Sequence, residues 1–117
     1  MNPTELKART KTFALRIIKL NRAIPKNDDA GRVIAKQIVR SGTSVAANYR
    51  ASCRARSQAE FIAKIGTVEE EADETALWLE LLVESGLMPV RKLSPLLQEA
   101  NDLTAIMVAS RKTASGN

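Results

Sequence analysis

The amino-acid sequence predicts an all-α protein, an up-and-down four-helix bundle formed by a single domain of residues 1–117. Apolar residues recur three and four positions apart in four successive segments, which is the periodicity of a helix with one buried face. Short segments with proline, asparagine or glycine separate them, and no segment shows the alternation of a strand. We expect helices at about residues 3–24, 28–54, 58–85 and 90–112.

The first helix has a clear start and stop. Asn2 supplies a capping side chain, Pro3 suits the first helical position, and Glu5 places a negative charge in the first turn. Pro25 ends the helix because its ring clashes with a continuing turn. The predicted buried face consists of Leu6, Thr10, Phe13, Ile17, Leu20 and Ile24.

The second helix is capped by the polar run Asn27, Asp28 and Asp29, whose carboxylates favour a helix N-terminus. We expect it to continue to about Arg54. Its apolar positions are Ile34, Ile38, Val45 and Tyr49, and Gly42 occupies the place in this stripe where a large side chain is missing.

The third helix begins at a capping box formed by Ser57 and Glu60. Ser85-Gly86 resembles a left-handed C-terminal cap, and Pro89 prevents continuation. Its seam is Phe61, Ile65, Val68, Ala72, Thr75, Leu79 and Leu82. Further apolar residues lie off this seam, and we expect some of them to contact another subunit: Ile62, Ala76, Leu77, Trp78, Leu81 and Val83.

The fourth helix has an apolar stripe but an ambiguous start. Either Ser94 is the cap and Pro95 the first helical residue, or Pro95 lies in an early turn of a helix beginning near Val90. The stripe is Leu93, Leu96, Ala100, Leu103, Met107 and Ser110.

Charge is distributed unevenly along the chain. Residues 1–56 hold 13 basic and 3 acidic side chains (net +10), whereas residues 57–117 hold 5 basic and 10 acidic ones (net −5). Such asymmetry indicates a nucleic-acid or other acidic partner for the basic half. The alternative is that the two halves neutralise each other within the fold or between subunits.

The composition argues against catalysis and metal binding. The chain has no histidine, which removes the usual general base and the commonest metal ligand. Ser41, Ser44 and Cys53 lack an evident activating base, and Cys53 is expected to be a small buried side chain. The acidic run 69–74 is expected to be solvated or salt-bridged, with one carboxylate pairing with arginines of the second helix. We therefore expect no catalytic residue, metal or cofactor.

The segment "SGTSVAAN", residues 41–48, places small and polar residues in the second helix. Small side chains allow close helix approach, and Asn48 is expected to hydrogen-bond across that contact. We assign Ser41, Gly42, Ser44 and Asn48 to helix packing or register in preference to binding. The nearby arginines are candidate nucleic-acid contacts, to phosphates because the chain has only four aromatic residues: Arg40, Arg50, Arg54 and Arg56.

Cellular location is indicated by three features. A single cysteine makes an internal disulfide impossible, the N-terminus has no apolar leader, and the most apolar run, "ALWLELLV", is short and interrupted by Glu80. We expect a cytoplasmic protein with no membrane partner.

Residues 39–82 resemble the bacterial four-helix-bundle family that includes proteins encoded in intervening sequences of large-subunit ribosomal RNA genes and the accessory variability protein of diversity-generating retroelements. The resemblance extends over nearly the whole chain. The resemblance is most specific in Arg40-Ser41, Ser44, Asn48, Cys53–Phe61, "EEADE" and Trp78-Leu79. It implies a ring-like homo-oligomer, typically a homopentamer, associated with structured RNA and, in the retroelement branch, with a reverse transcriptase. It implies no enzymatic activity. Some members have an acidic residue where this chain has Ala51.

Charge and resemblance together predict a non-enzymatic, homo-oligomeric accessory protein that binds nucleic acid, expected to be RNA, through phosphate contacts. The alternative is a protein-interaction scaffold, for example a partner of a reverse transcriptase or ribonucleoprotein, with no nucleic-acid contact of its own.

Overall fold

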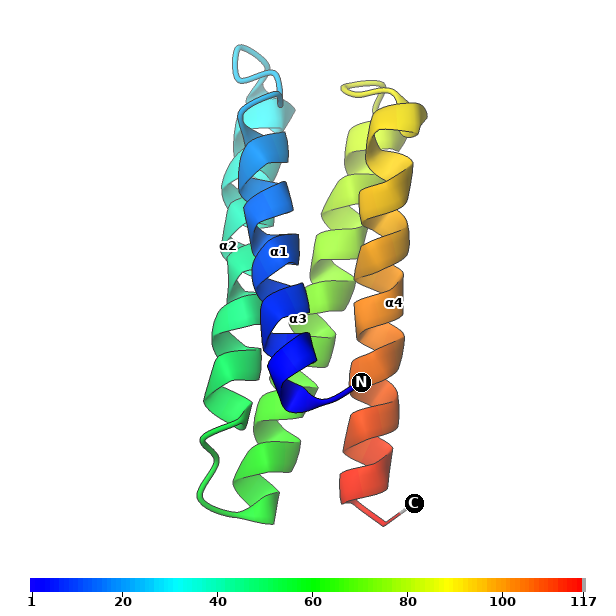
Figure 1. Cartoon of the computed structure of the whole chain (residues 1–117). Coiled ribbons are helices and arrows are strands. Elements are labelled where there is room, and N and C mark those ends of the chain that lie inside the picture. Colours follow the sequence, from blue (N-terminus) through cyan, green and yellow to red (C-terminus); the bar gives the residue numbers. More distant parts are fainter. Residues whose placement is uncertain (117) are drawn as a thin grey trace.

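Four helices run alternately up and down the bundle in the computed structural model, which describes residues 1–116 (Figure 1). They are α1 (Pro3–Asn21), α2 (Asp29–Ser52), α3 (Gln58–Glu84) and α4 (Val90–Ala114). The bundle measures 46 by 20 by 20 Å. Residues 1–116 contain no strand, so the predicted all-α four-helix fold is confirmed.

The first three helices begin at the predicted caps. The side chain of Asn2 accepts a hydrogen bond from the backbone of Glu5 at 2.8 Å, and Ser57 accepts one from Glu60 at 3.1 Å. Asp28 plays the same part for α2. Each cap satisfies a backbone N–H group that has no partner inside its helix.

α1 and α2 end two or three residues earlier than the sequence pattern indicates. After Asn21 and Ser52 the backbone bonds shorten to a span of three residues, as in the bond from Ala23 to Leu20. Ile24 is nevertheless buried, at 3% exposure. The apolar pattern therefore continues into the turn although the helix does not.

The start of α4 resolves the ambiguity around Pro95. The helix begins at Val90 with Pro89 at the cap position, and Pro95 lies inside it. The alternative start at Ser94 is wrong. No side chain caps this helix, and its first turn contains no acidic residue.

One apolar core runs the length of the bundle. The fully buried large side chains of the core come from all four helices: Phe13, Ile17, Ile38, Val45, Ile65, Val68, Leu79, Leu82, Leu93, Leu103 and Met107. α2 packs against α1 and α3, and α3 against α4, whereas α1 and α4 contact each other much less. The bundle is thus most open between α1 and α4, the helices at the two ends of the chain (Figure 1).

The fold accommodates more of the off-seam residues of α3 than expected. Ala76 belongs to the core, and Trp78 and Val83 pack against it while partly exposed. Leu77 and Leu81 remain 47% and 38% exposed. α3 has neighbours on two sides, so a wider arc of its surface is covered than a single seam would allow.

Among residues 1–116, no helix combines the length and the apolar composition that a membrane crossing requires.

Candidate nucleic-acid interface

Gly42 lies where α2 packs directly against Ile17 of α1. A Cβ atom at this position would come within 2.8 Å of Cγ2 of Ile17, well inside van der Waals contact. Only a residue without a side chain fits while Ile17 keeps its position. The missing place in the α2 stripe is therefore filled by an α1 side chain.

Ser41 faces the other neighbour of α2. Its hydroxyl accepts a hydrogen bond from the Thr75 hydroxyl of α3 at 2.8 Å, and both residues are fully buried. The Thr75 hydroxyl also lies 2.8 Å from the backbone carbonyl oxygen of Glu71 in its own helix. Ser41 and Gly42 thus contact α3 and α1 respectively, and neither reaches the surface.

Ser44 and Asn48 lie at the half-buried edge of α2. The Asn48 amide donates to the Ser44 hydroxyl at 2.8 Å and to the Ser44 carbonyl at 3.0 Å. The expected hydrogen bond from Asn48 across a helix contact is therefore absent from the described residues. The reason is spacing: residues four apart are neighbours on a helix surface, so Ser44 is the nearest partner.

Arg40 pairs with the acidic run of α3. Its guanidinium contacts Glu71 at 3.0 Å and also Glu74, which in turn accepts a hydrogen bond from the Trp78 indole at 3.0 Å. The hydrogen bond with Glu74 raises the pKa of Arg40 further above its ordinary value, with a smaller contribution from Glu71. The pairing of an α3 carboxylate with an α2 arginine is confirmed, and it engages one of the four candidate nucleic-acid contacts.

The other acidic side chains of residues 69–74 either form an ion pair or face solvent. Glu69 accepts a hydrogen bond from Arg111 of α4 at 2.9 Å, whereas Glu70 and Asp73 are exposed. Residues 1–116 hold no cluster of three or more potential metal-ligating side chains. This run therefore connects α3 to both of its neighbours.

Arg50 and Arg54 lie together with two lysines of α1. The four side chains line a shallow depression of about 600 Å³ between the start of α1 and the end of α2, together with Thr4, Ala8 and Cys53. We call Lys7, Lys11, Arg50 and Arg54 the basic cluster. No acidic residue lines the depression, and none of the four forms an ion pair within residues 1–116.

Lys7 and Lys11 were not among the residues singled out from the sequence. A signal was nevertheless present, because Lys7 and Lys11 repeat the four-residue spacing of Arg50 and Arg54. Residues four apart share a helix face, so Lys7 and Lys11 lie together on α1. Arg50 lies in the last turn of α2, and Arg54 follows in the turn after that helix. Whether the two pairs of cations lie close together depends on how α1 and α2 are aligned.

Arg56 and Cys53 occupy the turn that follows α2. Arg56 is exposed, its backbone N–H donates to Glu60 at 3.2 Å, and it does not line the depression. Cys53 is exposed, so the expectation of a buried thiol is wrong. Cys53 is the C-cap of α2, where the helix surface turns away from the core. Burial raises the pKa of the neighbouring Tyr49 to about 12, with smaller contributions from Cys53.

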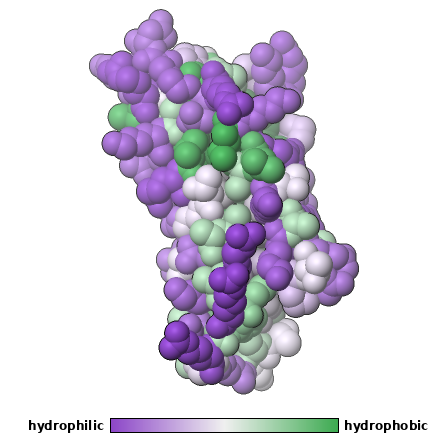
Figure 2. Space-filling model, turned by 60° about the vertical axis from the view of Figure 1, so that its left-hand side comes forward, coloured by the Kyte–Doolittle hydropathy of each residue, from purple (hydrophilic) through white to green (hydrophobic). Residues whose placement is uncertain are grey.

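A second group of cations lies at the opposite end of the same helix pair. Lys26, Arg32 and Lys36 line a groove of about 470 Å³ beside Val39. Arg32 pairs with Asp29, and the Lys26 ammonium donates to backbone carbonyls. In the upper part of Figure 2 a small apolar patch lies below and between hydrophilic side chains. The basic cluster thus retains more unpaired charge than this second group.

A sequence model described as 23S rRNA-intervening sequence protein matches residues 4–109, nearly the whole chain. The chain belongs to this family. The family predicted from residues 39–82 is thereby confirmed; a link to the retroelement accessory protein is not part of this match.

The fold of this chain is also found among solved structures. The chain is similar to a protein of unknown function from the S23 ribosomal protein family of Bacteroides thetaiotaomicron, with 31% sequence identity and a TM-score of 0.86. The match covers 96% of this chain and 99% of the other. None of the curated proteins matches the chain.

Proposed function

We propose that this protein is a non-enzymatic, cytoplasmic, homo-oligomeric accessory protein that binds structured RNA through phosphate contacts made by the basic cluster. A ring is the proposed assembly, and five subunits follow only from the family resemblance. Arg56 is proposed as an additional contact at the adjacent turn. Arg40 is proposed as a secondary contact, since its ion pairs with α3 compete with any phosphate.

The observation that carries this proposal is the basic cluster itself. Four exposed cations from α1, the end of α2 and the turn after it surround one depression that no acidic residue lines. Like charges held close together repel each other, and a polyanion relieves that repulsion while releasing its own counterions. The scarcity of aromatic residues favours phosphate contacts over base stacking.

The family name supports RNA as the polyanion, because it refers to an intervening sequence of 23S rRNA. An assembly that repeats the basic cluster on each subunit would multiply a weak contact through avidity. Binding of this kind is tolerant of RNA sequence and falls steeply with salt.

The test is a fluorescence titration of a labelled RNA hairpin at several salt concentrations. Arg50→Gln/Arg54→Gln should weaken binding and flatten the salt slope by roughly two units, about one for each lost phosphate contact. Arg91→Gln/Lys112→Gln removes the same charge from exposed positions of α4 and is the matched control. Equal effects of both double variants would contradict a localised site.

A protein-interaction scaffold, with a reverse transcriptase as one candidate partner, is the second candidate function. The ion pairs of Arg9, Arg32 and Arg40 favour it. Through them, acidic side chains of the same chain neutralise part of the basic charge. Absence of RNA binding at low salt would support this alternative.

A further inference from the structure

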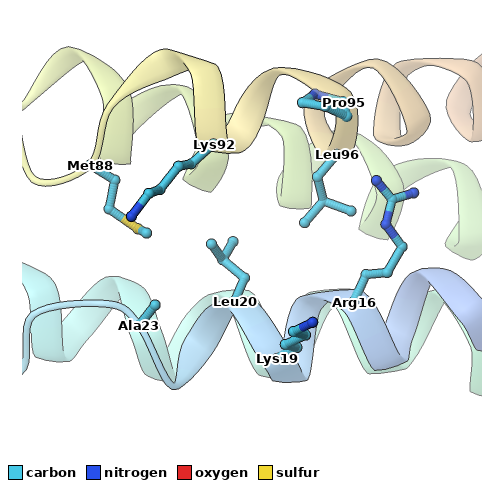
Figure 3. A pocket seen from close by; sticks show the side chains of 8 residues that line it. All are labelled: Arg16, Lys19, Leu20, Ala23, Met88, Lys92, Pro95 and Leu96. Atoms are coloured by element: carbon cyan, nitrogen blue, oxygen red, sulfur yellow. The ribbon is translucent and has the colours of Figure 1, made fainter.

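A groove of about 430 Å³ opens between the C-terminal part of α1 and the N-terminal part of α4 (Figure 3). Leu20 of α1 and Leu96 of α4 project toward each other across it, and Met88 projects from the turn before α4. These apolar side chains form the floor of the groove.

The rim of this groove carries charge of one sign. Arg16 and Lys19 of α1 and Lys92 of α4 line it, and no acidic residue does. Among residues 1–116 none of these three cations forms an ion pair. Closer to the N-terminus of α1 the situation differs, since Arg9 holds α4 through two hydrogen bonds to Glu99 at 2.6 and 2.7 Å. The groove therefore occupies the part of the α1–α4 boundary that no such ion pair bridges.

The outer surface of α3 has the opposite character. Asp73, Leu77, Leu81 and Glu84 follow one another three or four residues apart, so they form a stripe along one side of the helix. All four are exposed. Neither acid pairs with a cation within residues 1–116, in contrast to Glu69, Glu71 and Glu74 of the same helix. We call these four residues the acidic leucine stripe.

We propose that the α1–α4 groove of one copy of this protein binds the acidic leucine stripe of a second copy. The two leucines of the stripe would pack on the apolar floor of the groove. Asp73 and Glu84 have the charge opposite to that of the cations on its rim. Both halves of the contact are thus present in one chain, which favours a second copy over an unrelated acidic partner. The inference specifies the surfaces of the self-association contained in the proposed function and rests on it.

Because groove and stripe are different surfaces, the contact is heterologous. Each subunit uses its groove toward one neighbour and its stripe toward the other, and such contacts close into a ring or continue as a filament. The basic cluster lies on the α1–α2 side and belongs to neither surface, so it stays available to RNA in every subunit.

The test exchanges charge between the two surfaces. Arg16→Glu/Lys92→Glu reverses the groove and Asp73→Lys/Glu84→Lys reverses the stripe; all four side chains are exposed, and circular dichroism checks the fold. Sedimentation equilibrium should give an assembly for the parent and a shift toward the 12.8 kDa monomer for each variant. The variant that carries all four changes should assemble again, because opposite charges then face each other at every contact.

The control is Lys36→Glu/Lys112→Glu, which changes the net charge as much as the groove variant does but at positions outside the groove, and should assemble like the parent. A monomeric parent would contradict the self-association itself and leave the RNA titration as an independent test of binding. An assembled parent whose mass neither double variant changes would overturn this interface alone. Failure of the fourfold variant to reassemble would also overturn it, since the charges would then not face each other.

Discussion

The hydroxyl groups of Ser41 on α2 and Thr75 on α3 form a hydrogen bond of 2.8 Å inside a largely apolar core. Each hydroxyl also lies within reach of a backbone carbonyl of its own helix, but the bond between the two helices forms at only one alignment. This pair therefore favours one register of α2 on α3, which in turn sets where Arg40 meets Glu71 and Glu74.

The first prediction concerns the contribution of this hydrogen bond to the free energy of unfolding. Ser41→Ala should lower the free energy of unfolding by about 0.5–1.5 kcal/mol, the usual net contribution of one hydrogen bond. Thr75→Val should cost about as much, and the double variant should cost less than the two single effects together. Urea unfolding of the four proteins forms a double-mutant cycle, and strictly additive effects would show that the two hydroxyls do not interact.

The second prediction compares two glycines. Gly42→Ala should lower the free energy of unfolding by about 1–3 kcal/mol, because its Cβ would overlap Ile17. Gly66→Ala in α3 meets nothing within 4 Å and should raise it by up to about 1 kcal/mol through helix propensity. Thermal unfolding measures both. Equal stabilisation by the two substitutions would mean that α1 and α2 are further apart than the structure places them.

The third prediction separates paired from unpaired arginines. Arg40→Gln should change RNA affinity less than Arg54→Gln, since Arg40 is engaged by Glu71 and Glu74. Because the pair is partly exposed, its loss should cost at most about 1 kcal/mol of stability. It should also alter the fluorescence of Trp78, the single tryptophan, which donates to Glu74. A larger loss of RNA affinity for Arg40→Gln would make Arg40 a principal contact.

The fourth prediction concerns alkaline pH. The pKa of Tyr49 is about 12 in the folded protein against an ordinary value near 10, so the folded state holds this proton more tightly. The resulting stability is complete below pH about 10 and is lost as the pH rises toward 12, up to about 3 kcal/mol for a shift of this size. Tyr49 is the single tyrosine, so ultraviolet absorbance reports its titration directly. Tyr49→Phe should remove this part of the pH dependence, and an ordinary pKa in the parent would contradict it.

Local signals in the sequence determined much of the fold. Asn2, Asp28 and Ser57 cap their helices as predicted. The spacing of apolar residues identified most core positions of the four helices, although Leu20, Phe61 and Ser110 are only half-buried. These features depend on residues a few positions apart, so they can be recognised without knowing what packs against them. The absence of a side chain at Gly42 was visible for the same reason, although Ile17 as its neighbour was not.

The candidate site was decided by the tertiary structure. Lys7 and Lys11 are more than 35 residues from Arg50 and Arg54 in the chain, and only the alignment of α1 on α2 brings the four cations to one depression. Pairing of Arg40 with α3 likewise depends on the alignment of α2 on α3, and the exposure of Cys53 depends on where α2 ends. A charge acts through space over several ångströms, so whether it is neutralised depends on neighbours that the chain brings close only by folding.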